Sequence, residues 1–115
     1  MTKPIIFTDP ETEEKFTLEF SRESVVFTNR QGFKLSDFND NIEEMLPILW
    51  YGAFRKNHKN VSRQKTDHYL FDVLEGLTDA QATRLIQLYG DPRKALIKSD
   101  EEDGKNASKM LMMED

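Results

Sequence analysis

The chain has 115 residues, of which 37% are hydrophobic and 32% are charged, and its formal net charge is -5 at pH 7. This length predicts one domain with a single modest core, and the acidic balance disfavours general binding to nucleic acid. Because the chain has no cysteine, it has neither a disulfide framework nor a thiolate metal site.

Apolar runs are too short for secretion or membrane insertion. The run nearest the start, Ile5 to Phe7, is far below the roughly 7 to 15 residues of a signal-peptide core. No run approaches the roughly 18 apolar residues that span a bilayer. We therefore expect a protein of the cytoplasm with no membrane partner.

The first 20 residues predict a β-hairpin. Two β-favouring runs, Ile5 to Thr8 and Lys15 to Phe20, flank the turn-forming sequence Asp9-Pro-Glu-Thr12. Apolar side chains alternate along the second run. They are Phe16, Leu18 and Phe20. Because an isolated hairpin is marginal in water, this face must pack on helices. The expected fold class is α+β, mainly α, with the hairpin packed on about four helices.

The segment that follows the hairpin supports two interpretations. Its apolar and β-branched residues, Val25 to Thr28, favour a strand. Ser21, however, suits the N-cap of a helix, and Gly32 suits its end. We predict a short helix from Ser21 to Gln31.

The main core helix is expected next, because its apolar residues recur at helical spacing. They are Ile42, Met45, Leu46, Leu49, Trp50, Ala53 and Phe54. Glu43, Glu44, Tyr51 and Arg55 fall on the other faces. Pro47 lacks a backbone donor, so we expect a break or kink just before it.

Two capped helices should complete the domain. Ser62 suits the N-cap of a helix of about 13 residues, and Gly76 suits its end. Its apolar stripe comprises Thr66, Tyr69, Leu70, Val73, Leu74 and Leu77. Thr78-Asp-Ala-Gln81 fits a capping box for the next helix. We expect these two helices to pair as a helical hairpin, and Gly90-Asp-Pro92 to interrupt the last one.

The chain is expected to form a single globular domain over residues 1–97, followed by a flexible acidic tail over residues 98–115. Residues 99–109 are charged or small and cannot bury enough apolar area to offset the entropy of ordering them. The tail ends in an apolar patch. It consists of Met110, Leu111, Met112 and Met113.

No arrangement of residues points to catalysis, a cofactor or a metal. The carboxylates occur mainly in adjacent runs such as Glu43-Glu44, which are typical of solvated charge, and no nucleophile motif or phosphate-binding glycine loop occurs. His68 and Asp72 are four residues apart on a predicted helix, but no further ligands follow at a metal-binding spacing. We therefore interpret the protein as a non-enzyme that works by contact.

Three groups of residues are candidates for contact with a partner protein. The first is the basic cluster, Arg55, Lys56, Lys59, Arg63 and Lys65, which also suits a helix end and a solvated loop. The second comprises Tyr51 and Phe71, which fall off the apolar stripes and either anchor a partner or fill a second face of the core. The third is the run Met110 to Met113, whose flexible side chains suit varied apolar surfaces but also fit a chance run at a loose end.

Five segments carry a resemblance to a known family. They are Phe16-Thr-Leu-Glu-Phe-Ser-Arg-Glu-Ser-Val25, Gln31-Gly-Phe33, Leu49-Trp-Tyr-Gly-Ala-Phe-Arg-Lys-Asn-His58, Leu70-Phe-Asp-Val-Leu74 and Leu85-Ile-Gln-Leu-Tyr89. In their order and apolar positions they resemble the small tail assembly chaperones of long-tailed, siphovirus-type phages and prophages of Gram-positive bacteria. The resemblance covers about residues 16–96 and favours a helix at Ser21 to Gln31.

The resemblance implies a chaperone that binds the tape measure protein, prevents its aggregation and assists assembly of the tail tube protein. We expect a homo-oligomer, because several copies with weak contact surfaces would hold a long helical client more tightly than one copy could. Its expected place of action is the host cytoplasm, and it is expected to be absent from the mature virion. Many such chaperones also have a longer form made by ribosomal frameshifting, and the tail over residues 98–115 is where that extension would attach. The alternative is a small adaptor or regulatory phage protein that acts on a host protein by surface binding.

Overall fold

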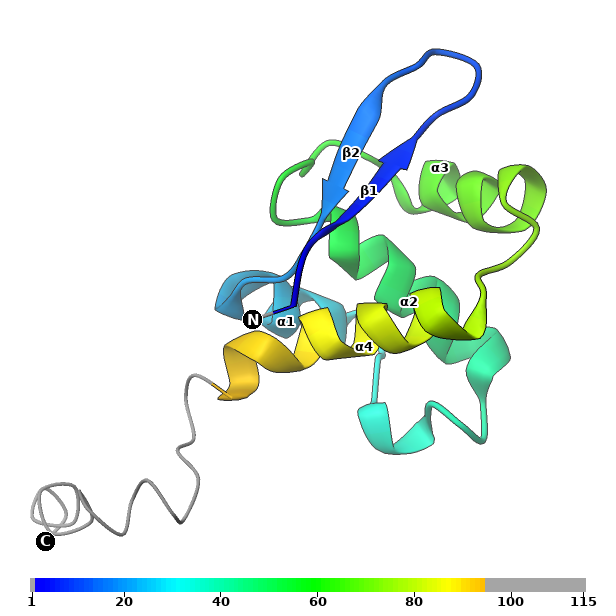
Figure 1. Cartoon of the computed structure of the whole chain (residues 1–115). Coiled ribbons are helices and arrows are strands. Elements are labelled where there is room, and N and C mark those ends of the chain that lie inside the picture. Colours follow the sequence, from blue (N-terminus) through cyan, green and yellow to red (C-terminus); the bar gives the residue numbers. More distant parts are fainter. Residues whose placement is uncertain (1, 95–115) are drawn as a thin grey trace, which may run out of the picture.

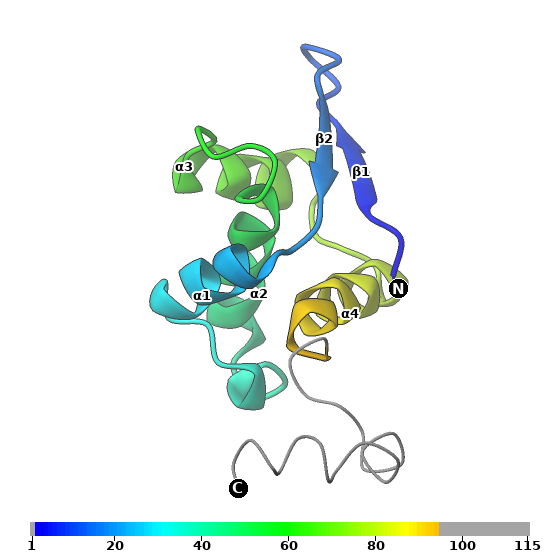
Figure 2. The same ribbon diagram turned by 90° about the vertical axis from the view of Figure 1, so that its left-hand side faces the viewer.

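The computed structural model describes residues 2–94. A hairpin of β1 (Ile5–Thr8) and β2 (Lys15–Leu18) precedes the helices (Figures 1 and 2). The helical elements, in chain order, are α1 (Arg22–Arg30), the short 3-10 helix η1 (Leu35–Asp37), α2 (Ile42–Phe54), α3 (Arg63–Asp67) with its continuation η2 (His68–Val73), and α4 (Asp79–Lys94). This arrangement confirms the predicted α+β class and the hairpin on a small group of helices. The predicted tail, residues 98–115, lies outside the described residues.

The hairpin forms where the sequence predicts it, and Asp9 shapes its turn. The strands are antiparallel, with Phe7 opposite Phe16. The Asp9 backbone N–H donates to the Glu14 carbonyl at 2.8 Å, and Asp9 Oδ1 accepts from the Glu11 N–H at 2.8 Å. Such a side-chain bond to the backbone two residues on is how aspartate stabilises turns. β2 is two residues shorter than expected, because the N–H of Glu19 turns to the carbonyl of Ala53 at 3.2 Å.

The outer edge of β2 is covered by the segment that follows α2. The Thr17 N–H donates to Nε2 of His58 at 3.0 Å, and Nδ2 of Asn57 donates to the Thr17 carbonyl at 3.0 Å. The His58 ring therefore serves as a hydrogen-bond acceptor for a strand edge. The backbone N–H of His58 donates to the carbonyl of Phe54, at the end of α2, at 2.8 Å.

The core is built around α2, which packs against β2, α1, α3 and α4. Leu49, Trp50, Ala53 and Phe54 are at most 1% exposed, as the apolar stripe predicts. The stripe is wrong at its first residue, because Ile42 is 42% exposed at the start of the helix. Three residues outside the stripe are buried as well. They are Pro47, Ile48 and Gly52. Burial therefore extends around most of the second half of α2.

Neither proline breaks its helix, which corrects the expected break before Pro47 and the expected interruption at residues 90–92. α2 continues through Pro47, and α4 continues through Gly90, Asp91 and Pro92 to Lys94. A proline inside a helix removes one hydrogen bond. Pro47 lies near the start of α2, four residues after the exposed Glu43, and Pro92 lies in the last turn of α4. The carbonyl that loses its donor is therefore near a helix end, where water and packing offset the loss more easily.

The third helix differs from the prediction in its form and in its neighbour. It begins after the Ser62 cap as predicted, since Ser62 Oγ accepts from the Lys65 N–H at 3.1 Å. The α-helical part has 5 residues and continues as a π-helix of 6 residues, η2. The chain then turns at Gly76, which has a φ of +103°. α3 and α4 each pack on α2 and hardly touch one another, so the predicted helical hairpin is wrong.

Within residues 2–94, no helix combines the length and the apolar character that crossing a bilayer requires.

Candidate protein-contact surfaces

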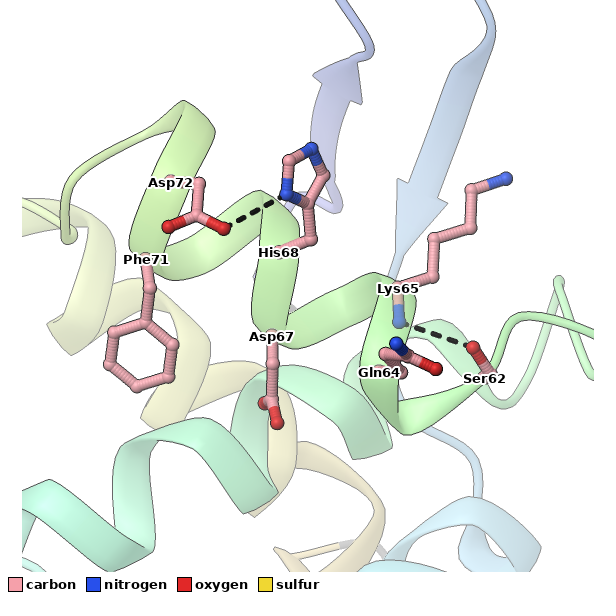
Figure 3. Close-up of a pocket in the computed structure, with 7 residues that line it drawn as sticks. All are labelled: Ser62, Gln64, Lys65, Asp67, His68, Phe71 and Asp72. Atoms are coloured by element: carbon pink, nitrogen blue, oxygen red, sulfur yellow. Dashed lines mark hydrogen bonds and ion pairs between the residues drawn. The ribbon is translucent and has the colours of Figure 1, made fainter.

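The most exposed aromatic side chain of the described residues is Phe71, which is 56% exposed on η2. It borders an open depression of about 600 Å³ on the outer side of α3 and η2. The lining residues are Ser62, Gln64, Lys65, Asp67, His68, Phe71 and Asp72 (Figure 3). Phe71 and Asp67 point to the same side of this helical segment. The sequence prediction that Phe71 lies off the core stripe agrees with this position.

Phe71 lies within the π-helical segment η2. The Leu74 N–H donates to the Tyr69 carbonyl, five residues earlier, at 2.9 Å, which defines the wider turn. Tyr69 and Leu70 are each 2% exposed and face the core, whereas the next residue, Phe71, faces solvent. π-helical turns occur frequently at functional sites.

Three polar residues that line this depression, Asp67, His68 and Asp72, have partners within the chain. Arg63 Nε lies 2.9 Å from Asp67 Oδ1, and His68 Nδ1 lies 3.0 Å from Asp72 Oδ2. Both pairs link residues four apart on one helical face, and such exposed pairs contribute little to stability. The surface therefore combines one large apolar ring with charged groups that already have partners.

Tyr51, the other off-stripe aromatic, occupies a different environment. It is half-buried, and its ring meets the ring of Phe27 on α1 edge-on at a centroid distance of 5.4 Å. The Arg55 guanidinium lies over the same Phe27 ring, 4.4 Å from the ring centroid. Tyr51 does not line the depression beside Phe71. The structure thus places Tyr51 and Arg55 in the contact between α1 and α2.

Each member of the basic cluster has a neighbour within the chain. Lys56 pairs with Glu19 at 3.4 Å, and Lys59 pairs with Glu23 at 3.6 Å. Lys65 lies 5.8 Å from the Phe16 ring centroid. With Arg55 on Phe27 and Arg63 on Asp67, the cluster is divided among several local contacts. This arrangement favours the interpretation as helix-end and loop charges over a single basic patch.

A second depression, of about 270 Å³, lies beside β1. Its lining residues are Ile5, Ile6, Phe7, Thr8, Trp50, Leu74, Leu77 and Gln81. Sequence reasoning missed this apolar depression, because its walls come from three segments that are far apart in the chain. The predicted hairpin did contain one relevant signal, since any two-stranded sheet has two outer edges.

One buried hydrogen bond connects the hairpin turn to η2. The Tyr69 hydroxyl donates to Asp9 Oδ2 at 2.8 Å. The N–H of Glu11 and the Tyr69 hydroxyl together lower the pKa of Asp9 below its ordinary value of 3.8. Burial, and then the bond to Asp9, raises the pKa of Tyr69. The pair is therefore a carboxylate and a protonated phenol, which suits a structural link.

The last candidates from the sequence are the two histidines and the run Met110 to Met113. In the part of the chain that the structure describes, no group of three or more His, Cys, Asp or Glu residues is arranged to hold a metal ion. His68 and Asp72 do lie together, but His58 faces β2 instead. The predicted contact residues Met110 to Met113 lie outside the described residues.

Comparison with known proteins gives one finding. A family model described as a domain of unknown function, DUF5055, matches residues 1–112. The chain belongs to this family. The DUF5055 match includes every described element, from β1 to α4. Searches of curated proteins and of solved structures gave no match.

Proposed function

We propose that this DUF5055 protein is a phage tail assembly chaperone that binds the tape measure protein, prevents its aggregation and assists assembly of the tail tube. The observation that carries the proposal is the exposed ring of Phe71 beside an open depression on η2. The resemblance described above supports it through the order of the elements. In particular, the helix that this resemblance favoured at Ser21 to Gln31 is present as α1.

The Phe71 surface suits weak, repeated contact with apolar helical segments. One aromatic ring gives a modest anchor, and the ion pairs around it keep the free surface hydrated. A long client offers many such segments, and several linked copies hold it more tightly than one copy does. The proposal therefore includes a homo-oligomer, with the tape measure protein and the tail tube protein as its partners.

The proposed place of action is the cytoplasm of the infected or lysogenic bacterium, during virion assembly. As an assembly factor, the protein would leave the tail before the virion matures. Residues 98–115 would be the attachment point of a longer, frameshifted form. A gene whose end contains no slippery heptamer and no overlapping downstream frame would remove the frameshift part of the proposal.

Co-expression with the tape measure protein tests the function. The wild-type chain should keep the tape measure protein soluble, and Phe71→Ser should lose most of this effect because it removes the exposed ring. Leu35→Ser is the matched control, since Leu35 is 40% exposed on η1 and does not border the Phe71 depression. Circular dichroism should show the same helical content for all three proteins.

Two results would count against the proposal. One is equal protection of the tape measure protein by wild type and Phe71→Ser. The other is a gene position away from the major tail protein and tape measure genes, combined with capture of a host protein. That second result would favour the regulatory alternative.

A further inference from the structure

The two outer edges of the hairpin differ, because among residues 2–94 hydrogen bonds cover only the edge of β2. Thr17 directs both its N–H and its carbonyl away from β1, toward His58 and Asn57. Ile6 is opposite Thr17. In an antiparallel pair, opposite residues either bond each other or both point outward. The backbone groups of Ile6 therefore point away from β2, at the outer edge of β1.

In the described part of the chain, the outer edge of β1 has no hydrogen-bonded partner from Ile6 to Thr8. By the same alternation, Thr8 also directs its backbone groups outward, and both Ile6 and Thr8 are exposed. Among the described residues, no hydrogen bond reaches the outward groups of these two residues. Before β1, Arg84 covers the chain by donating to the carbonyls of Lys3 and Pro4, at 3.1 and 2.8 Å. Unpaired strand edges readily accept a further strand.

An apolar depression adjoins this same open edge. All four residues of β1 line it, and Trp50, Leu74 and Leu77 form apolar walls. Ile6, whose side chain is 57% exposed, adds apolar surface at the strand. The site therefore offers backbone donors and acceptors together with space for an apolar side chain. This combination is the requirement for recognition by strand addition.

We propose that the run Met110 to Met113 of the same chain docks at this edge as a third strand beside β1. Beyond Lys94 the chain continues for 21 residues, and this run is the apolar part of the acidic stretch that ends it. Methionine adapts to irregular apolar pockets, and an extended segment of four residues matches the four-residue length of β1. The proposal does not depend on the proposed chaperone function.

The connecting length places the run within reach of the edge. The Thr2 N–H donates to Asp91 Oδ2 at 2.9 Å, so the start of the chain lies at the last turn of α4. The four residues from Thr2 to Ile6 span at most about 14 Å. With the Thr2–Asp91 hydrogen bond and the helical turn from Asp91 to Lys94 added, Lys94 lies within about 25 Å of Ile6. The 16 residues from Lys94 to Met110 extend to at most about 55 Å. A random coil of this length has a root-mean-square span of about 20 to 24 Å, which is comparable with the upper limit on the gap.

Docking would give the open edge an occupant within the chain. The third strand would pair the outward groups of Ile6 and Thr8 and place an apolar side chain near Leu74 and Leu77. Because a connection of this length can span the gap, the local concentration of the run at the edge is on the order of millimolar. Any outside segment that binds by strand addition would have to displace it.

Amide hydrogen exchange on the full chain tests the proposal. Leu111→Asp combined with Met112→Asp should speed exchange at Ile6 and Thr8 by about tenfold, which corresponds to a docked fraction of about 90% in the wild type. The matched control places the same two charges just before the run, as Ala107→Asp with Ser108→Asp, and should leave the exchange at both amides unchanged. Circular dichroism confirms that each variant keeps the fold.

A spin label distinguishes docking within one chain from exchange between copies. Because the natural chain has no cysteine, Ser108→Cys gives a single attachment site for a nitroxide. The label should broaden the amide signals of Ile6 and Thr8 in a dilute sample of the labelled chain. It should not broaden them when labelled chains without ¹⁵N are mixed with unlabelled ¹⁵N chains.

Three outcomes would overturn the proposal. The first is unchanged exchange at Ile6 and Thr8 in the Leu111→Asp, Met112→Asp variant. The second is faster exchange in the control variant to the same extent. The third is broadening in the mixed sample, which would assign the edge to the tail of a second copy.

Discussion

The close contact between α1 and α2 at Gly52 makes Gly52→Ala an informative change. Gly52 is buried in α2 against Thr28 of α1, which is 0% exposed. A Cβ at position 52 would overlap Thr28 Oγ1 and lie 2.8 Å from both Cβ and Cγ2 of that side chain. Thr28 cannot easily rotate away, because its hydroxyl donates to the Ser24 carbonyl at 2.7 Å. The two helices must therefore separate, or a buried hydrogen bond must break.

Two opposing terms decide the magnitude. Replacing glycine by alanine inside a helix favours folding by about 0.8 to 1 kcal/mol. Overpacking a core costs about 1 to 3 kcal/mol and sometimes more, and overlap with a fixed side chain belongs at the upper end of that range. We expect Gly52→Ala to lower the free energy of unfolding by about 2 kcal/mol. For a domain of this size, that corresponds to a fall in Tm of about 8 to 16 °C.

Urea unfolding followed by circular dichroism measures the effect, and Gly90→Ala is the matched control. Gly90 also lies in a helix, α4, but an added Cβ there would meet no atom within 4 Å. Gly90→Ala should therefore raise the free energy of unfolding, by up to about 1 kcal/mol. In a Thr28→Ala background, the penalty of Gly52→Ala should shrink by at least about 1 kcal/mol. A Gly52→Ala protein as stable as wild type, or equal penalties in both backgrounds, would refute this account of the α1–α2 contact.

Three further predictions concern the hairpin and the last helix. The folded-state pKa of Asp9 is lowered, so its stabilising effect is complete above about pH 4 and disappears as the pH falls through that lowered value. Asp9→Asn should therefore lose less stability than wild type on acidification below pH 4 in thermal melts, and equal acid sensitivity would contradict the role of the carboxylate. His58→Ala should leave the Thr17 N–H without its acceptor and cost about 1 to 3 kcal/mol, with faster amide exchange at Thr17. Unchanged exchange there would show that the ring is dispensable. Thr78→Ala removes the N-cap of α4, where Thr78 Oγ1 accepts from the Gln81 N–H at 3.1 Å. It should cost about 1 kcal/mol in urea unfolding, and no change would indicate that this end of α4 is frayed in the wild type.

Short-range bonds explain why several elements could be predicted. Ser21 caps α1 through a reciprocal pair of bonds with Ser24, and Gly32 follows the helix with a φ of +107°. Thr78 and Gln81 form the expected capping box at α4. Each of these devices operates within four residues, so the local sequence contains all of its partners. The same holds for the turn that Asp9 stabilises in the hairpin.

The wrong predictions concern helix continuity and helix pairing, which depend on contacts beyond the local sequence. The sequence predicted interruptions at Pro47 and Pro92, but both helices continue because the lost bonds are near helix ends and the surrounding contacts remain. Pairing of the third and fourth helices was expected from their adjacency in the chain, whereas both instead pack on α2. The π-helical form of η2 had no recognisable local signal.

The sequence by itself determined the fold class, the capped helix starts and the hairpin turn, because these follow from apolar periodicity and from bonds between near neighbours. Only the tertiary structure decided which edge of the hairpin is covered, where the β1 depression lies and how the basic residues are paired. Those features depend on side chains that folding brings together from separate segments. Asn57 and His58 cover the edge of a strand some 40 residues earlier in the chain. No local sequence pattern predicts that contact.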